Sequence, residues 1–192
     1  SKGMGKSKPG FQPPARCLVT GGSGLCGQRL VEMLVERGSK YVVSFDLAPA
    51  PKDALTSECV EYVQGDLCDY EGVKKACKNV DCVFHIAALV GPYFPTDAYY
   101  KVNYEGTGNV LKACRDLGIK KIVMSSSPST RFPYPDPNVN GYTEDDLYRL
   151  NKGDFAPVFL QPYAETKAMG EKLVRDACGK KKGDLLTIAV AP

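Results

Sequence analysis

The sequence predicts an α/β protein with a doubly wound, mostly parallel sheet of six or more strands. Short apolar runs alternate with segments of helical periodicity along nearly the whole chain, the pattern of repeated strand–helix–strand units. The first unit carries a glycine-rich turn between its strand and its helix. Such a turn is typical of parallel sheets that bind a nucleotide at the carboxyl ends of their strands.

Composition and charge indicate an ordinary globular domain. The chain has 192 residues, and its 25 basic and 22 acidic residues leave a net charge of +3, too small to indicate nucleic acid binding. No apolar run approaches the ~20 residues that a membrane span needs, and the start lacks the apolar segment of a secretory signal. We expect a disordered tail over 1–14, one domain over 15–192 and a cytoplasmic protein.

Cysteine and histidine usage gives no metal-binding pattern. The chain has eight cysteines, none in a C-x-x-C pair, and a single histidine, so no metal site is expected. Most of the cysteines lie within apolar segments. We therefore interpret them as small core residues of a protein in a reducing compartment.

The glycine-rich turn follows a strand over 17–20 and opens a helix that ends near Gly38. Gly21 is expected to turn the chain sharply, Gly24 to let a pyrophosphate approach the backbone, and Gly27 to let the helix pack closely. The helix start then faces the phosphates with its N–H groups and positive dipole end. An apolar stripe is expected along one helix face, formed by Leu25, Leu30, Val31, Leu34 and Val35.

The second strand, 41–46, ends in Asp46, 25 residues after Gly21. An acid there accepts hydrogen bonds from the ribose hydroxyls of the adenosine half and repels a 2′-phosphate. No arginine follows Asp46, because the next residues are Leu47, Ala48 and Pro49. The sequence therefore favours NAD over NADP as the cofactor.

The third and fourth strands are expected over 60–64 and 80–88. Asp66, after the third strand, has two compatible readings: contact with the adenine amino group, or the N-cap of a helix over 70–78. The small Ala87 and Ala88 would let a cofactor lie against the fourth strand. His85 within that strand is interpreted as a packed residue rather than a base.

The next helix, 99–117, contains Asn103, a polar residue that could anchor a loop or a water near the cofactor. The fifth strand, 120–127, ends in three serines at the edge where ligands bind in parallel sheets. A long loop over 128–162 follows, with a short helix near 145–150, and loops of this length commonly form substrate walls. A helix from Tyr163 to Ala177 and a sixth strand over 185–191 complete the chain.

Tyr163 and Lys167 lie four residues apart on one face of the last helix. A phenol titrates near ~10, and a nearby ammonium favours the phenolate, so the pair can accept a proton from an alcohol. The same spacing occurs at Tyr70 and Lys74, away from the expected crevice, and at Tyr148 and Lys152, before helix-breaking residues. Only Tyr163 begins a long amphipathic helix after the serine-ended strand.

These motifs resemble the extended short-chain dehydrogenase/reductase superfamily, which implies a Rossmann domain over 15–192. The resemblance is greatest to the branch of 3β-hydroxysteroid dehydrogenases and decarboxylating sterol-4α-carboxylate 3-dehydrogenases. Ala191-Pro192 departs from the Arg-Pro usual at the end of the sixth strand. The motifs that carry the resemblance are Thr20-Gly21-x-x-Gly24-x-x-Gly27, Asp46, Gly65-Asp66-Leu67-Cys68, Val83-Phe84-His85, Val102-Asn103-x-x-Gly106-Thr107, Ser125-Ser126-Ser127 and Tyr163-x-Glu165-Thr166-Lys167.

The resemblance implies a role for each residue. Tyr163 would be the acid/base, Lys167 would tune it and hold the nicotinamide ribose, and Ser127, with Ser126 as the alternative, would bind the reacting oxygen. The expected cofactor contacts are Gly21, Gly24, Leu25, Cys26, Gly27, Asp46, Asp66, Leu67, Ala87 and Lys167.

The expected function is NAD-dependent oxidation of a 3β-hydroxyl on a steroid or sterol-like small molecule. Two alternatives stay open: a nucleotide-sugar epimerase or dehydratase of the same superfamily, and an NAD-binding module without turnover. Plant-type dihydroflavonol or cinnamoyl reductases are disfavoured by Asp46, since they mostly use NADP. Family members extend beyond the sixth strand, so we expect a chain truncated before the small substrate domain. Exposed apolar surface should then favour association, for example as a homodimer. A longer parent could associate with the endoplasmic reticulum membrane.

Overall fold

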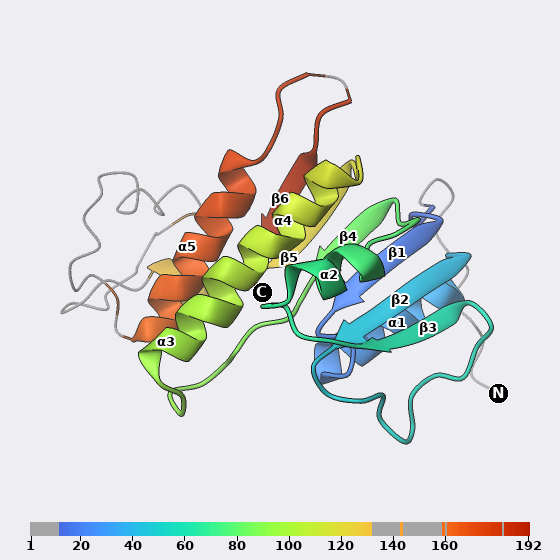
Figure 1. Cartoon of the computed structure of the whole chain (residues 1–192), viewed down its shortest axis with the longest axis horizontal. Helices are drawn as coiled ribbons and strands as arrows, with labels where there is room; N and C mark the ends of the chain where they lie inside the picture. Colours follow the sequence, from blue (N-terminus) through green and yellow to red (C-terminus); the bar gives the residue numbers. More distant parts are fainter. Residues whose placement is uncertain (1–11, 132–142, 144–158, 160, 182) are drawn as a thin grey trace.

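The computed structural model describes residues 12–131, 143, 159, 161–181 and 183–192. Its centre is a six-stranded sheet in the order β3-β2-β1-β4-β5-β6, with every neighbouring pair parallel (Figure 1). The sequence-based prediction of a doubly wound parallel sheet is confirmed. The strands are β1 Arg16–Thr20, β2 Tyr41–Asp46, β3 Val60–Gln64, β4 Cys82–His85, β5 Lys121–Ser125 and β6 Leu186–Val190.

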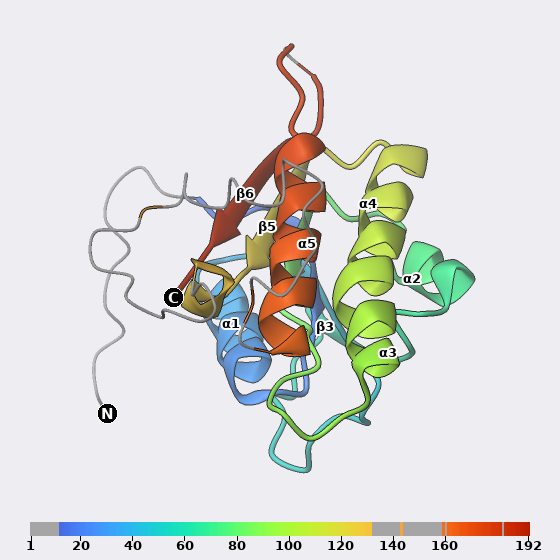
Figure 2. The ribbon, with the colours of Figure 1, turned by 90° about the vertical axis from the view of Figure 1, so that its left-hand side faces the viewer.

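Helices cover both faces of this sheet. Helix α1 (Leu25–Glu36) lies on one face, whereas α2 (Tyr70–Ala76), α4 (Gly106–Asp116) and α5 (Pro162–Asp176) lie on the other (Figure 2). A short 3₁₀ segment, η2 (Pro128–Arg131), follows β5. Among the described residues, no helix is both long and apolar enough to cross a membrane.

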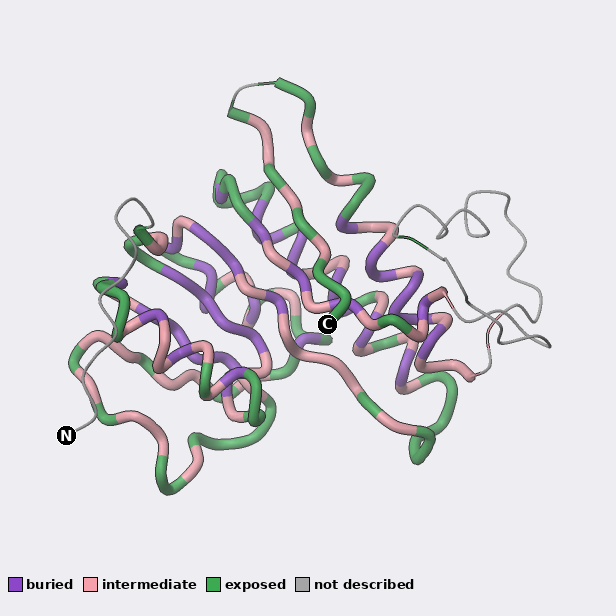
Figure 3. The backbone as a smooth tube through the Cα atoms, turned by 180° about the vertical axis from the view of Figure 1, so that it is seen from behind, coloured by how far each residue is buried: buried purple, intermediate pink, exposed green. Residues whose placement is uncertain are grey.

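The two apolar layers follow from the alternation of side chains along the strands. Leu18 of β1 packs into the layer beneath α2, α4 and α5, while its neighbours Cys17 and Val19 pack beneath α1. In α1, Val31 and Leu34 are buried against the sheet. Figure 3 shows the buried backbone concentrated in the strands and the inner helix faces.

The edge strand β6 presents apolar side chains to solvent. Leu186, Ile188 and Val190 alternate along the strand and are 53%, 60% and 49% exposed. The exposed apolar surface expected from the sequence is therefore present on this face.

Several boundaries differ from the sequence-based predictions. Strand β4 ends at His85 and β5 at Ser125, earlier than predicted, although the amides of Ile86 and Ser126 still bond the carbonyls of Thr20 and Val190. The amide of Ala87 then donates to the side-chain hydroxyl of Thr20 in β1 rather than to a backbone carbonyl. Leu25 is 88% exposed and does not join the apolar stripe of α1. Most of the expected tail over 1–14 and the short helix near 145–150 lie outside the described residues.

The helix predicted over 99–117 begins earlier and is not uniform. It consists of α3 (Thr96–Tyr99), a π-helical segment η1 (Tyr100–Glu105) and α4, in continuous succession. A π-helical turn has one extra residue and is frequently found at functional sites.

The prediction that the cysteines are core residues is only half right. Cys17, Cys77, Cys82 and Cys114 are buried, whereas Cys26, Cys68 and Cys178 are exposed. The exposed thiols lie at helix starts or in loops, where an apolar neighbourhood in sequence does not require burial.

Candidate active site

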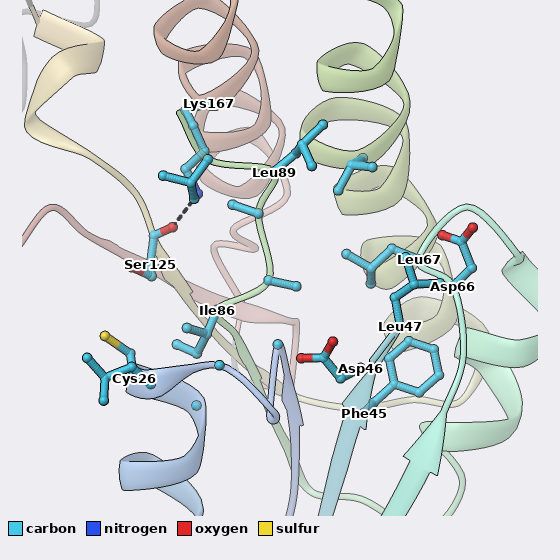
Figure 4. Close-up of a pocket in the computed structure, with 18 of the residues that line it drawn as sticks. Cys26, Phe45, Asp46, Leu47, Asp66, Leu67, Ile86, Leu89, Ser125 and Lys167 are labelled. Carbon is cyan, nitrogen blue, oxygen red and sulfur yellow. Dashed lines mark hydrogen bonds between the residues drawn. The ribbon is translucent and has the colours of Figure 1, made fainter. Parts of the chain in front are cut away.

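A cleft of about 470 Å³ lies at the carboxyl ends of the parallel strands. In Figure 4, Asp46 and Asp66 lie on one side of it, and Lys167 and Ser125 lie on the other. The cleft brings together every site residue predicted from the sequence except Ser127. Those residues are Gly21, Gly24, Leu25, Cys26, Gly27, Asp46, Asp66, Leu67, Ala87, Tyr163 and Lys167.

The glycine turn has the geometry that the sequence predicts. Gly21 has a φ of +73°, a backbone conformation that favours glycine. A Cβ added at Gly27 would lie 2.0 Å from the carbonyl oxygen of Gly21, so only glycine allows this close approach. At Gly24 the nearest atom to an added Cβ is 3.4 Å away, so that position is open toward the cleft.

The first turn of α1 is suited to an anion. No side chain caps it, and it contains no acidic residue. The exposed Leu25 and Cys26 line the cleft at this point. Uncapped N–H groups and the positive dipole end favour a phosphate there.

Asp46 ends β2 beside the glycine turn. Its carboxylate accepts hydrogen bonds from the amide of Ser23 at 3.0 Å and the amide of Ala48 at 2.9 Å. These bonds fix the carboxylate at the cleft while leaving lone pairs on each oxygen for further donors. The residue is thus placed to accept ribose hydroxyls.

The prediction that Asp66 caps the following helix is wrong. Asp69 is the N-cap of α2 and accepts from the amide of Glu71, whereas Asp66 accepts from the amide of Cys68 at 2.8 Å. Two acids spaced three residues apart precede this helix, and the helix begins after the second. Asp66 lines the cleft, so its contact with an adenine stays a prediction.

His85 is a buried structural residue, as the sequence predicts. Its Nε2 lies 2.9 Å from the hydroxyl of Thr107, which itself donates to the carbonyl of Asn103. Nε2 therefore carries the proton, and Nδ1 accepts from the hydroxyl of Thr20 at 2.8 Å. Burial, aided by the ammonium of Lys167, lowers the pKa of His85 to about 3, so the ring is neutral.

Asn103 anchors a loop, one of the two roles expected for it. Its side-chain oxygen accepts from the amide of Leu89 at 2.7 Å, and its side-chain nitrogen donates to the Leu89 carbonyl at 3.1 Å. Asn103 lies within the π-helical segment. Together with the hydrogen bond from the Ala87 amide to Thr20, it holds the strip 87–89 that lines the cleft.

Lys167 is nearly inaccessible, with 3% of its surface exposed. Its ammonium donates to the carbonyl of Ser125 at 2.6 Å. Burial disfavours the charged form and lowers the pKa of Lys167 to about 8, against an opposing effect of Glu171. The half-buried Tyr163, one turn earlier on α5, lines the same cleft.

The three serines at the end of β5 and just after it have different surroundings. Ser125 and Ser126 line the cleft, and the Ser126 hydroxyl donates to Glu171. The Ser127 hydroxyl lies 2.8 Å from that of Ser129 and is not among the lining residues. Sequence reasoning missed Glu171, although its position four residues after Lys167 could have indicated it.

The other tyrosine–lysine pair in the described chain lies elsewhere. Tyr70 bonds Asp116 and lies outside the cleft, as expected. The pair at 148 and 152 lies outside the described residues. Among the described residues, no group of three or more potential metal ligands occurs.

The strand order, glycine turn and tyrosine–lysine pair define an α/β domain of the short-chain dehydrogenase/reductase class. Within this class the chain belongs to the 3-beta hydroxysteroid dehydrogenase/isomerase family, whose pattern matches residues 18–192.

Curated relatives include two different named activities. The chain is 37% identical over 178 residues to a mouse decarboxylating sterol-4-alpha-carboxylate 3-dehydrogenase, covering 92% of this chain and 45% of that protein. It is also 37% identical over 177 residues to a 2-alkyl-3-oxoalkanoate reductase of Stenotrophomonas maltophilia, covering 92% of this chain and 50% of the relative. The chain thus spans about half the length of these relatives.

Solved structures share the fold. A UDP-glucose 4-epimerase of Thermus thermophilus in complex with NAD superimposes with a TM-score of 0.72 at 29% identity, covering 92% of this chain and 54% of that one. A short-chain dehydrogenase/reductase superfamily protein of Agrobacterium tumefaciens with bound NAD gives 0.70 at 29% identity, with 92% and 48% coverage.

Proposed function

We propose that this protein is an NAD-dependent dehydrogenase that oxidises a hydroxyl group of a small molecule to a ketone. The family membership and the dehydrogenases among the relatives support this reaction class. We further propose a 3β-hydroxyl of a steroid or sterol-like compound as the substrate group, in line with the name of the family and of the mouse relative.

The cofactor site fits NAD at three points. The glycine turn and the uncapped start of α1 would hold the pyrophosphate. Gly24 has no Cβ, so the pyrophosphate could approach the backbone there. Asp46 would accept the hydroxyls of the adenosine ribose and would repel the 2′-phosphate of NADP. Ala87, two residues after the end of β4, would let the cofactor lie against the backbone.

In this proposal, α5 supplies the residue that accepts the proton of the substrate hydroxyl. Tyr163 would accept the proton of the substrate hydroxyl, and Lys167, one helical turn later on α5, lines the same cleft. Ser127 would hold the reacting oxygen. NAD, when bound, supplies the acceptor for the hydride.

A single observation carries this proposal: one cleft is lined by Asp46, the glycine turn, Tyr163 and Lys167, which come from distant parts of the chain. The test is NADH formation by the full-length gene product with 3β-hydroxysteroids, comparing wild type with Tyr163→Phe. We expect a loss of about 10²–10⁴-fold in kcat, the usual contribution of a general base.

Tyr70→Phe is the matched control, because Tyr70 has a lysine at the same spacing but lies outside the cleft. It should retain wild-type turnover. Equal activity of Tyr163→Phe and wild type would reject the assignment of Tyr163.

A nucleotide-sugar epimerase is the second candidate, favoured by the similarity to the Thermus epimerase. In that reaction hydride leaves the sugar and returns to it, so NADH does not accumulate. Conversion of a nucleotide sugar without net reduction of NAD would support this alternative. NAD binding with neither reaction would support a binding module without turnover.

A further inference from the structure

A buried ion pair joins η2 to α5, the helix that carries Tyr163 and Lys167. Arg131 of η2 donates to both carboxylate oxygens of Glu171 on α5, at 2.5 Å and 2.7 Å. Their side chains are only 8% and 3% exposed. Two parallel bonds of this kind give defined geometry, but the desolvation of both charges makes such a pair a weak source of stability. A role in positioning is therefore worth testing.

Glu171 also connects α5 to the end of β5. The Ser126 hydroxyl donates to the carboxylate, and the Ser126 amide donates to the carbonyl of Val190 in β6 at 2.7 Å. One turn earlier on α5, Lys167 donates to the carbonyl of Ser125. The last residue of β5, Ser125, and the residue after it, Ser126, are thus bound to two residues one helical turn apart on α5.

The charges around Lys167 make Glu171 electrostatically relevant. The carboxylate of Glu171 raises the pKa of Lys167 against the effect of burial. Arg131, and Arg175 at 3.9 Å from the carboxylate, offset that negative charge. In β4, the ammonium of Lys167 helps to lower the pKa of His85, whose ring is neutral. Tyr163, the other member of the Tyr163–Lys167 pair, lies on the same helix as Lys167.

We propose that Glu171, held by Arg131 and Ser126, is a positioning residue for the Tyr163–Lys167 pair. Its carboxylate fixes the end of β5 against α5 and keeps a negative charge one helical turn from Lys167. This inference rests on the proposed function, since positioning has meaning only if the pair acts on a substrate.

The proposal also separates the roles of two neighbouring serines. The hydroxyl of Ser126 is buried and committed to Glu171, so it belongs to the positioning unit. Ser127 is half-buried and bonded only to its near neighbours Ser129 and Thr130 in the described contacts. Its hydroxyl is not bonded to Glu171 in the described contacts, so the two serines can be tested separately.

The experiment measures the pKa of Lys167 directly, by NMR of labelled lysine side chains in the free protein. Glu171→Gln should lower it by about one unit or more, because a charge about one helical turn away is lost. Arg131→Met should raise it, because the carboxylate is no longer neutralised. The double variant should return it toward the wild-type value.

Asp176→Asn is the matched control, since it removes an exposed acid from the end of the same helix. It should leave the pKa of Lys167 unchanged. If Glu171 only held the two elements together, the two single variants would not shift the pKa of Lys167 in opposite directions. An unchanged pKa of Lys167 in Glu171→Gln, or shifts of the same sign in Glu171→Gln and Arg131→Met, would therefore overturn the proposal. If Glu171→Gln does not fold, Arg131→Met and its comparison with Arg131→Lys, which keeps the charge, decide the question.

Turnover gives a second readout. The alkaline limb of the kcat profile should move to lower pH in Glu171→Gln, and Ser126→Ala should lower kcat less than Ser127→Ala. A wild-type protein without dehydrogenase turnover would refute the proposed function, whereas normal turnover with unmoved pKa values would refute the role of Glu171 alone.

Discussion

Replacing Lys167 by methionine should change how the stability of the protein depends on pH. Burial holds the folded-state pKa of Lys167 at about 8, against 10.5 for the free side chain. Below pH 8 both states carry the proton, but the folded state holds the charge at a cost. As pH rises from about 8 towards 10.5, the folded lysine is already neutral while the unfolded one still binds a proton. Wild-type stability therefore rises with pH in this window.

The size of the effect follows from the two pKa values. A shift from 10.5 to about 8 corresponds to roughly 3 kcal/mol in total, of which about 2 kcal/mol is regained between about pH 7 and pH 9.5. Lys167→Met has no proton to lose and lacks this gain. The variant also loses the hydrogen bond to the carbonyl of Ser125, a cost that does not depend on pH.

The assay is urea unfolding of wild type and variant at both pH values, with the free energy of unfolding compared pairwise. The titration of the thiols changes the free energy of unfolding of both proteins equally, so its effect cancels in this comparison. Lys172→Met, on the more exposed side of α5, controls for loss of a lysine from this helix. The reasoning is refuted if wild type and Lys167→Met change by the same amount between the two pH values.

Two further predictions concern the glycine turn and the buried histidine. Gly27→Ala should lower the free energy of unfolding by about 1–3 kcal/mol, because its Cβ would meet backbone atoms 2.0 Å and 2.8 Å away. Gly24→Ala should instead keep the stability and weaken NAD binding. Thermal unfolding and calorimetry distinguish the two, and equal melting temperatures would count against the packing argument. ¹⁵N NMR of His85, the only histidine, should show the Nε2–H tautomer and no protonation of the folded protein near its ordinary pKa of 6.5. Since the folded pKa is about 3, His85 stabilises the fold fully above about pH 6.5, and that contribution should be lost as the pH falls; a titration midpoint near 6.5 in the folded state would contradict the assignment.

The sequence predicted the sheet and most of the candidate site because both depend on local patterns. The glycine spacing determines the turn before α1, and the tyrosine–lysine spacing places both side chains on one helix face. Since parallel strands place their carboxyl ends at one edge, Asp46 and Ala87 follow from their positions at strand ends.

Other features depend on contacts that no local pattern encodes. Arg131 and Glu171 are 40 residues apart, and only the packing of η2 against α5 brings them together. Periodicity over 99–117 indicates a helix but does not reveal the π-helical turn around Asn103. The cap of α2, for which Asp66 was one of two readings, is Asp69, although either acid could precede the helix by a plausible spacing.

The central claim is that the cleft binds NAD through Asp46, and calorimetric titration tests it most directly. Wild type should bind NAD more tightly than NADP. Asp46→Asn keeps the shape of the side chain but loses its charge. The ratio of the affinities for NAD and NADP should therefore fall by about tenfold or more, equivalent to roughly 1.4 kcal/mol. Asp53→Asn, an exposed acid outside the cleft, should keep the wild-type preference. Failure of wild type to bind NAD, or equal affinity for NAD and NADP, would contradict the claim.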